Sequence, residues 1–283
     1  MPASKLTSDG TREATSDTTR AVAPASALYD VLAPVYDRWQ RAGGMTPFSE
    51  VALAKLLPAL ERHGRNAGPE RSGVRSDIRC FVDLGCGTGD LLLGLARAQP
   101  RWRLLGLDGS AAMLEVARGK PGAERIDWTH SPVTAPSLPA GLDAAGCFYD
   151  TLNHLTEIDA LDAAVAAIAA ALRPGGLFVF DTTNERGFDQ WWRQGQRLWR
   201  GPGWSVAVET HYDPLSRRGQ AEVVVEDRDQ RATASLTERC FHPAEIRAAL
   251  TAAGLELLVE EPWSPFDIDA PGKTWWIGRN RPR

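Results

Sequence analysis

The sequence has 283 residues, of which 43% are hydrophobic and 24% charged, with a formal net charge of -4 at pH 7. This length suits one large domain or two small ones, and a mildly acidic chain argues against a nucleic-acid surface, which would show clustered Lys and Arg. No apolar run reaches membrane-spanning length and the first residues lack the apolar core of a secretion signal, so we expect a cytoplasmic protein. Because the cysteines form no C-x-x-C pair, neither a disulfide framework nor a zinc site is indicated; they are Cys80, Cys86, Cys147 and Cys240.

The chain begins with a polar segment. Residues 1–27 are rich in Ser, Thr, Ala and Asp, so burial could not offset the entropy of ordering them, and we expect a disordered tail. Tyr29, Leu32 and Tyr36 then recur at helical spacing, although Pro34 must break the run. Spacing alone favours a short amphipathic helix that caps the fold.

From residue 79 onward, strand-like and helix-like segments alternate, which predicts an α/β fold with a parallel sheet covered on both faces by helices. Residues 63–77 precede them as a polar loop. Ligands of such sheets lie at the carboxyl ends of the strands, where we find Gly85, Asp108 and Asp150. The predicted strands cover residues 79–84, 103–107, 125–130, 143–149 and 176–181, and the predicted helices cover 48–62, 89–98, 110–118 and 157–172.

A glycine-rich turn follows the first predicted strand, with Gly85, Gly87 and Gly89 in a G-x-G-x-G pattern. Residues without a Cβ let the backbone bend beneath a ligand, and a helix that starts there points free N–H groups at it. A dinucleotide fingerprint would have its third glycine at Asp90, and no G-K-[ST] follows. Both the dinucleotide motif and the P-loop are therefore excluded.

Two carboxylates flank this turn. Asp83 precedes the first glycine, where it would oppose a pyrophosphate but suits an ammonium group. Asp108 ends the second predicted strand, where a carboxylate can accept both hydroxyls of a ribose. A ribose and an amino acid without a phosphate describe S-adenosylmethionine.

Three segments in this order resemble the class I S-adenosylmethionine-dependent methyltransferases, namely residues 83–89 (DLGCGTG), 106–114 (GLDGSAAML) and 172–181 (LRPGGLFVFD). The resemblance covers about residues 28 to 280. It implies a seven-stranded, mostly parallel Rossmann-like sheet of order 3-2-1-4-5-7-6, closed by an antiparallel hairpin over residues 255–261 and 273–279.

The resemblance also implies the cofactor contacts, with Met113 against the adenine and with Tyr29 and Tyr36 closing the entrance as a lid, the alternative being a plain cap. The acid that often receives the adenine amino group is missing after the third strand. Its place is taken by Ser131, so that contact would come from this hydroxyl, from the backbone or from Asp127. The predicted cofactor-binding residues are Tyr29, Tyr36, Asp83, Gly85, Cys86, Gly87, Asp108, Gly109, Met113, Ser131 and Tyr149.

Residues 186–240 depart from the strand-helix alternation. Their period-two segments with intervening turns predict an antiparallel unit inserted after the fifth strand, which in the resembling families roofs the acceptor pocket. Tryptophans 191, 192, 199 and 204 crowd its start, either as the core of a thin sheet or as an aromatic wall for an acceptor. We assign Trp191 to substrate binding. A helix over residues 243–253 then returns the chain to the main sheet.

The candidate catalytic residue is His154, which follows the fourth predicted strand in an Asn-His-Leu segment. A His in the equivalent place is found in natural-product and aminosugar N-methyltransferases, which this segment resembles. Histidine titrates near neutrality and can accept a proton, although it could instead cap the next helix. We predict that Asp150, Asn153 and His211 contact the acceptor, with N-capping as the alternative for the first two.

We therefore expect residues 28–283 to form one methyltransferase domain (EC 2.1.1 type) that methylates nitrogen or oxygen of a small molecule, as the natural-product, aminosugar and glycine N-methyltransferases do. In-line transfer depends on holding the two reacting atoms in a dry pocket, so no metal is required. The alternatives are a protein or peptide methyltransferase and a non-catalytic S-adenosylmethionine-binding subunit. The expected partners are the acceptor and, as one option, a second copy in a homodimer, with no nucleic acid and no membrane.

Overall fold

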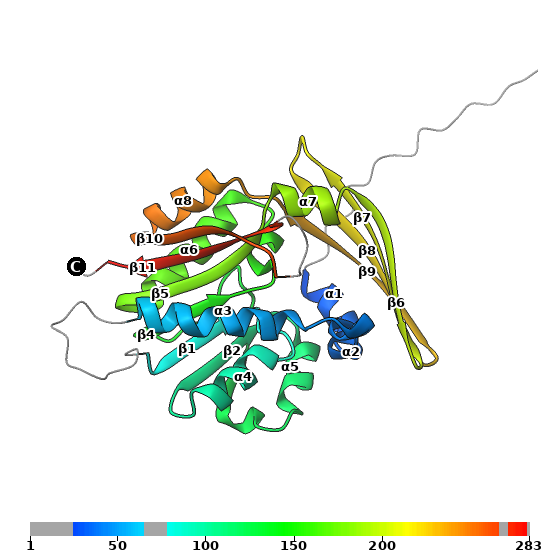
Figure 1. Cartoon of the computed structure of the whole chain (residues 1–283), viewed down its shortest axis with the longest axis horizontal. Helices are drawn as coiled ribbons and strands as arrows, with labels where there is room; N and C mark the ends of the chain where they lie inside the picture. The colour runs from blue at the N-terminus through cyan, green and yellow to red at the C-terminus, as the bar shows by residue number, and fades with distance from the viewer. Residues whose placement is uncertain (1–24, 65–77, 266–270, 282–283) are drawn as a thin grey trace, which may run out of the picture.

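The strands of the main sheet follow the apolar runs of the sequence. A computed structural model describes residues 25–64, 78–265 and 271–281. The strand order is β10-β11-β5-β4-β1-β2-β3, which confirms the predicted order 3-2-1-4-5-7-6 (Figure 1). The strands are β1 (Cys80–Leu84), β2 (Arg103–Asp108), β3 (Ile126–His130), β4 (Leu142–Cys147), β5 (Leu172–Thr183), β10 (Leu255–Trp263) and β11 (Lys273–Asn280).

The last two strands form the predicted antiparallel hairpin, in which β11 pairs with both β10 and β5. Strand β5 begins earlier than the predicted residue 176 because Leu172 pairs with Leu142 before the register shifts. Strand β4 ends at Cys147, two residues before the predicted end. The chain therefore leaves the sheet directly before Tyr149 and Asp150.

Helices cover both faces of the main sheet, as predicted. Alternate residues of a strand point to opposite faces. Phe81 of β1 accordingly shares a core with Leu92 and Leu114, whereas the next residue, Val82, shares another with Leu161 and Ile246. The first face carries α3 (Phe48–His63), α4 (Asp90–Ala98) and α5 (Ala111–Arg118), and the second carries α6 (Ile158–Ala171) and α8 (Pro243–Ala252).

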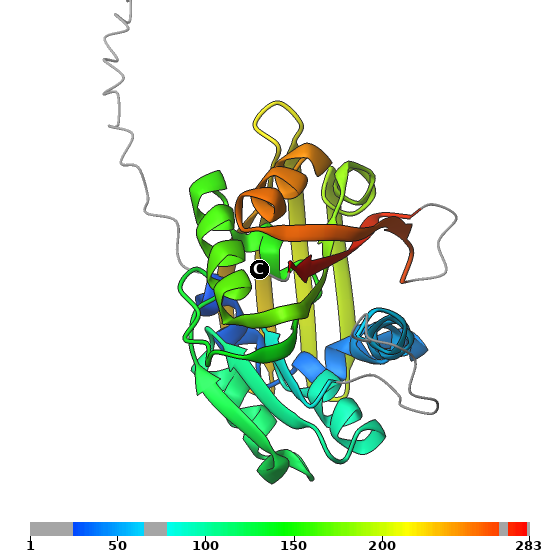
Figure 2. The same cartoon turned by 90° about the vertical axis from the view of Figure 1, so that its left-hand side faces the viewer.

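The inserted unit forms a separate four-stranded antiparallel sheet of order β6-β7-β8-β9, as predicted. A helix that was not predicted, α7 (Glu185–Trp191), leads into it because the Asn184 side chain caps its start by accepting the Gly187 N–H at 3.1 Å. In Figure 1 this sheet stands to the right of the main body, and in Figure 2 its strands run behind the main sheet. Its strands are β6 (Gln194–Gly201), β7 (Trp204–Asp213), β8 (Arg218–Asp227) and β9 (Gln230–Arg239).

The first helices lie between the two sheets (Figure 1). Helix α1 (Ala25–Leu32) ends just before Pro34, as the proline requires, and α2 (Tyr36–Gln40) follows. Helix α1 contacts β9 and α5, and α2 contacts β6. Residues 1–24 of the predicted tail lie outside the described residues, whereas its last three begin α1.

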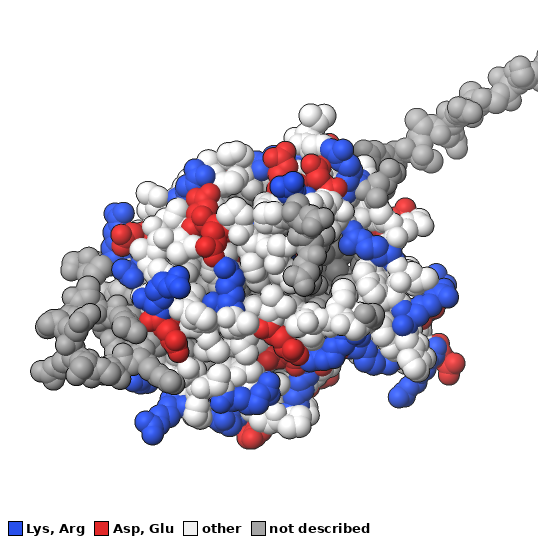
Figure 3. Space-filling view, viewed as in Figure 1, with Lys and Arg blue, Asp and Glu red and all other residues white. Residues whose placement is uncertain are grey.

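Charges of both signs are interspersed on the face shown in Figure 3, where Lys and Arg form no continuous patch. Within the described ranges no helix has the length and apolarity needed to cross a membrane.

Candidate functional site

The glycine-rich turn bends as the sequence predicts. Gly85, Gly87 and Gly89 all have left-handed backbones, with φ of 70°, 54° and 80°. The N–H groups of Gly85 and Cys86 donate to the Leu107 carbonyl at the end of β2, at 2.8 and 3.0 Å. A Cβ at Gly87 would meet no atom within 4 Å, so this backbone borders open space. The turn thus offers a ligand its bare main chain.

Asp108 is held in place by the backbone. Its Oδ2 accepts the N–H of Gly87 at 2.7 Å and its Oδ1 accepts the N–H of Ser110 at 2.8 Å. Burial raises the pKa of Asp108, and these two hydrogen bonds oppose the rise. The carboxyl is therefore fixed in orientation while still lining a cavity.

Asp83 is buried at the other side of the turn. Its Oδ1 accepts no hydrogen bond from any residue that the structure describes. Burial, with a smaller contribution from the nearby Asp108, raises the pKa of Asp83 to about 8. A buried oxygen without a donor points to a donor supplied by a ligand, such as an ammonium group.

A cavity of about 380 Å³, here called the turn cavity, opens over the glycine-rich turn. Most of the predicted cofactor residues and the predicted catalytic residue line it; they are Tyr29, Tyr36, Gly85, Gly87, Asp108, Gly109, Met113, Tyr149 and His154. Asp83 and Cys86 line an adjoining space of about 70 Å³. The structure therefore brings most of these predicted residues together around one cavity.

The side chains predicted to contact the adenine amino group do not line the turn cavity. Ser131 is buried and its Oγ accepts the N–H of Ser137 at 2.9 Å, so it does not line the cavity. Asp127 points outward from β3 and pairs with the exposed Arg103. The neighbouring wall is made by residues 132–134, which leaves backbone contact as the remaining alternative.

A second cavity of about 360 Å³, here called the roof cavity, lies under the antiparallel sheet. Its wall includes Tyr29, Tyr36, Tyr149 and Leu236, which also line the turn cavity. The two cavities therefore meet at these shared side chains. Four tryptophans contribute further wall, namely Trp39, Trp191, Trp192 and Trp199.

His154, in the short 3₁₀ helix η3 (Thr151–His154), lines the turn cavity and contacts Tyr29, which lines both cavities. Its Nε2 is 2.8 Å from the Tyr29 hydroxyl, and its Nδ1 is 3.3 Å from Oε1 of Glu238 without hydrogen-bond geometry. Burial lowers the pKa of His154 to about 4, although Asp150 opposes the shift. The imidazole is therefore neutral near pH 7, so one of its ring nitrogens carries a free lone pair.

Comparisons with known proteins agree with this geometry. Residues 81–176 match the family model described as a methyltransferase domain. The matched segment contains the glycine-rich turn and Asp108, so this part of the chain is similar to the class I S-adenosylmethionine-dependent methyltransferases. It is 32% identical over 157 residues to a ubiquinone biosynthesis O-methyltransferase of Methylobacterium sp. (strain 4-46), covering 52% of this chain and 58% of that one. The chain spans 43% to 58% of the length of the first curated relatives that it matches.

Solved methyltransferases share the fold over most of the chain. The CcbJ methyltransferase of Streptomyces caelestis superimposes with a TM-score of 0.70 at 22% identity, covering 90% of this chain and 98% of the other. CalS10, an amino pentose methyltransferase of Micromonospora echinaspora solved with its S-adenosylmethionine, gives a TM-score of 0.62 at 25% identity, covering 87% and 96%.

The residues around the turn cavity fit S-adenosylmethionine. The unpartnered Asp83 oxygen suits the ammonium of the amino acid end, and the fixed Asp108 carboxyl suits ribose hydroxyls. Met113 and Phe148 offer apolar surface to the base and the thioether chain. The open space above Gly87 leaves room for the ligand to approach the backbone.

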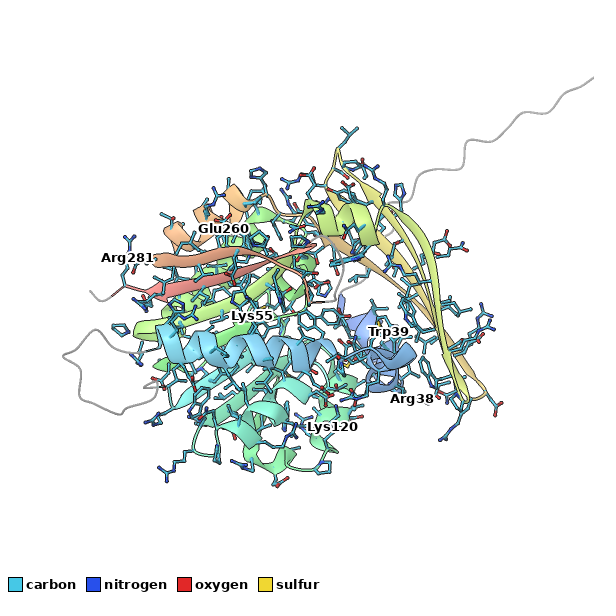
Figure 4. All side chains as sticks on the ribbon, viewed as in Figure 1. Arg38, Trp39, Lys55, Lys120, Glu260 and Arg281 are labelled. Carbon is cyan, nitrogen blue, oxygen red and sulfur yellow. The ribbon has the colours of Figure 1, made fainter. Side chains whose placement is uncertain are left out.

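Hydrogen bonds and ion pairs attach helices α1 and α2 to the part of the chain that carries the glycine-rich turn. The Ser110 hydroxyl donates to Asp30 and the Thr88 hydroxyl donates to Asp37, both at 2.6 Å. Lys120 lies 2.6 Å from both Asp37 and Asp90. Figure 4 shows Arg38 and Trp39 of α2 in the region between the two sheets, with Lys120 below them.

The sequence analysis did not predict a buried ionic cluster that the structure contains. Lys273, at the start of β11, pairs with Asp150 and, at 2.7 Å, with Asp181 at the end of β5. Burial lowers the pKa of Lys273, but the two carboxylates outweigh burial and raise it overall. Asp181 also accepts the Tyr149 N–H at 2.7 Å, which holds the turn where Tyr149 and Asp150 have φ of 58° and 61°. An acid at a strand end was the available signal for Asp181.

Two predicted acceptor contacts are not brought to the roof cavity. Asn153 is fully buried, and its amide bonds the backbone of Thr183 and Arg239, so it joins η3 to β5 and β9. His211 is exposed, because alternation along β7 turns its neighbour Thr210 inward instead. Of the predicted acceptor residues, Asp150 and Trp191 do line this cavity, whereas Trp204 belongs to the core of the antiparallel sheet.

Proposed function

We propose that this protein transfers the methyl group of S-adenosylmethionine to nitrogen or oxygen of a small molecule held in the roof cavity. The observation that carries the proposal is the meeting of the turn cavity and the roof cavity at Tyr29, Tyr36 and Tyr149, beside His154. The relatives favour the same reaction, since their names include an O-methyltransferase and an amino pentose methyltransferase. The antiparallel sheet covers the roof cavity, which suits a small acceptor better than a protein chain.

Bound S-adenosylmethionine supplies an electrophilic methyl group on a positively charged sulfur. Asp83 and Asp108 hold the amino acid end and the ribose of that molecule, on either side of the glycine-rich turn. Tyr29 and Tyr36 exclude water from the boundary between the cavities. Orientation of this kind can supply much of the rate enhancement, because it replaces the entropy of bringing two reactants together.

His154 serves as the proton acceptor. Its neutral imidazole can take the proton that the acceptor loses, and the Tyr29 hydroxyl at Nε2 fixes the plane of the ring. The low pKa of the buried ring means that it returns the proton readily to solvent after release of the product.

A direct screen tests the reaction. The purified chain is incubated with S-adenosylmethionine bearing a deuterated methyl group and with a panel of amines, phenols and carboxylic acids, and the products are analysed by mass spectrometry. We expect one acceptor class to gain a labelled methyl group while S-adenosylhomocysteine accumulates. Calorimetry showing no affinity for either cofactor form would refute the proposal, and tight binding without any labelled product would favour a non-catalytic subunit.

A further inference from the structure

Glu238 is a buried carboxyl that the sequence did not single out. Alternation along β9 turns Leu236 and Glu238 inward, and Glu238 is only 2% exposed while lining the roof cavity. Its Oε2 accepts no hydrogen bond from any residue in the described ranges. An unsatisfied buried carboxyl oxygen is costly unless a bound molecule supplies the donor.

The charges around Glu238 do not supply that donor. Lys273, the cation of the neighbouring cluster, is bound to Asp150 and Asp181. Burial raises the pKa of Glu238 well above its usual range, Asp150 raises it further, and Lys273 opposes the rise. Arg197 also lines the roof cavity, but its guanidinium donates to the backbone carbonyl of Trp191. The other titratable groups at this boundary are His154, Tyr29 and Tyr149.

Aromatic rings form the rest of the wall. Trp39 and Trp199 meet edge to face with centroids 5.5 Å apart, and both line the roof cavity with Trp191 and Trp192. Indole faces attract cations and also bury apolar groups. A cavity that combines such a wall with one unpaired carboxyl suits an apolar body carrying one positive charge.

We infer that Glu238 makes this enzyme select a cationic amine as its acceptor, with Oε2 binding the ammonium and Oε1 facing His154. The inference rests on the proposed methyl transfer and narrows its acceptor to amines. A phenol or an alcohol brings no charge to offset the burial of the carboxylate, so Glu238 discriminates against both.

The proton and electron balance is simple. The bound ammonium gives one proton to His154, and the Glu238 carboxylate 3.3 Å away stabilises the imidazolium. The freed nitrogen lone pair forms the new C–N bond, and the electrons of the broken C–S bond remain on a neutral thioether. The methylated nitrogen keeps the positive charge, and the proton on His154 passes to solvent after the product leaves.

Binding can be tested apart from chemistry. The full chain saturated with S-adenosylhomocysteine is titrated with benzylamine and with benzyl alcohol, and with cyclohexylamine and cyclohexanol, while tryptophan fluorescence is followed. We expect each amine to bind about 10- to 100-fold more tightly than its alcohol. Equal affinity within both pairs would overturn the inference.

Variants then locate the preference. Glu238→Gln keeps the side-chain size and removes the charge, so it should abolish the preference for amines, while Glu238→Asp should retain part of it. The control is Glu222→Gln, the same substitution at an exposed position of the same sheet. Affinity for S-adenosylhomocysteine and the melting temperature report folding of each variant. A preference that survives in a folded Glu238→Gln variant would overturn the inference.

The experiments distinguish failure of the proposed reaction from failure of the proposed role of Glu238. If amines bind through Glu238 but no acceptor in the mass-spectrometric screen gains a methyl group, the reaction is wrong and Glu238 is a ligand-binding residue. If phenols or alcohols are methylated and amines are not, the reaction stands and the role of Glu238 is wrong.

Discussion

The turn cavity and the roof cavity are of similar size but are built in different ways. One side of the turn cavity comes from strand ends and the turn over Gly85 to Gly89, where backbone N–H groups hold Asp108, and Tyr29 of α1 and Leu236 of β9 complete its wall. The roof cavity joins side chains from α1, α2, α7, the antiparallel sheet and β11. Lys273 and Asp181 pair there, whereas Oε2 of Glu238 accepts no hydrogen bond from any residue that the structure describes. A binding site for a common cofactor can thus be fixed by backbone geometry, whereas acceptor recognition depends on long-range packing.

The sharpest test of this division is His154→Ala at the boundary. Loss of a general base lowers turnover by about 10²- to 10⁴-fold, whereas affinity for S-adenosylhomocysteine should stay close to that of the wild type because backbone groups and carboxylates hold it. Steady-state kinetics with the acceptor identified by the screen, together with calorimetry, would separate the two effects. His211→Ala, at an exposed histidine of β7, is the control. Comparable turnover in both variants would contradict the role of His154.

In the turn cavity, Asp108→Asn should lower the affinity for the cofactor, which His154→Ala should leave unchanged. One carboxylate oxygen is replaced by an NH₂ group that faces a backbone N–H, and the negative charge is lost. We expect affinity for S-adenosylhomocysteine to fall about 10- to 100-fold, measured by calorimetry. The control is Asp127→Asn, at an outward-facing position of β3. If both variants bound equally well, backbone contacts alone would suffice for the cofactor.

Asp83 gives a pH dependence that belongs to the turn cavity. Its native pKa of about 8 lies above the usual 3.8, so between these pH values the native state binds more protons than the unfolded state. The free energy of unfolding should therefore fall with rising pH, by at most about 1.4 kcal/mol per pH unit from this group. Urea unfolding of the protein without cofactor, from pH 5 to pH 8, should show a flatter dependence for Asp83→Asn. Parallel curves for the variant and the wild type would exclude this origin.

The smallest effect is expected at the attachment of α2. Lys120→Gln removes the positive charge that lies between the carboxylates of Asp37 and Asp90. Because these side chains are partly exposed, the free energy of unfolding should fall by about 0.5–1 kcal/mol. The midpoint of urea unfolding measures it, with Arg103→Gln in the more exposed pair with Asp127 as the control. A loss confined to the Arg103 variant would show that α2 does not depend on this contact.

The same division explains what could be predicted. The strands and the glycine-rich turn follow from apolar runs and spacing that involve neighbours in sequence, whereas the strand order was implied by the resemblance to class I methyltransferases. Glu238 and Lys273 could not be found that way, because each acts through residues more than 80 positions away. The alternation that buries Leu236 does point to Glu238, but it gives no reason to expect His154 opposite.

The residues not brought to a cavity show the limits of reasoning from position. Asn153 lies beside His154 in sequence, yet its amide matches backbone groups of two other strands and is used there. Ser131 occupies the position where the resembling methyltransferases often have an acidic residue. Its short side chain stays near the backbone, and its hydroxyl closes the local turn by accepting the Ser137 N–H. A polar side chain near a site can hold the local backbone in shape just as readily as it can contact a ligand.

The contact between Tyr29 and His154 joins residues 125 positions apart, and α1 also packs against β9. During synthesis, this helix can meet α5 once residue 118 has been made, but its remaining surface stays uncovered until residue 239 emerges. Distant pairings of this kind form late and leave apolar side chains open to other molecules in the meantime. The segments that carry Gly85 and Asp108 are therefore synthesised well before the antiparallel sheet that covers the roof cavity.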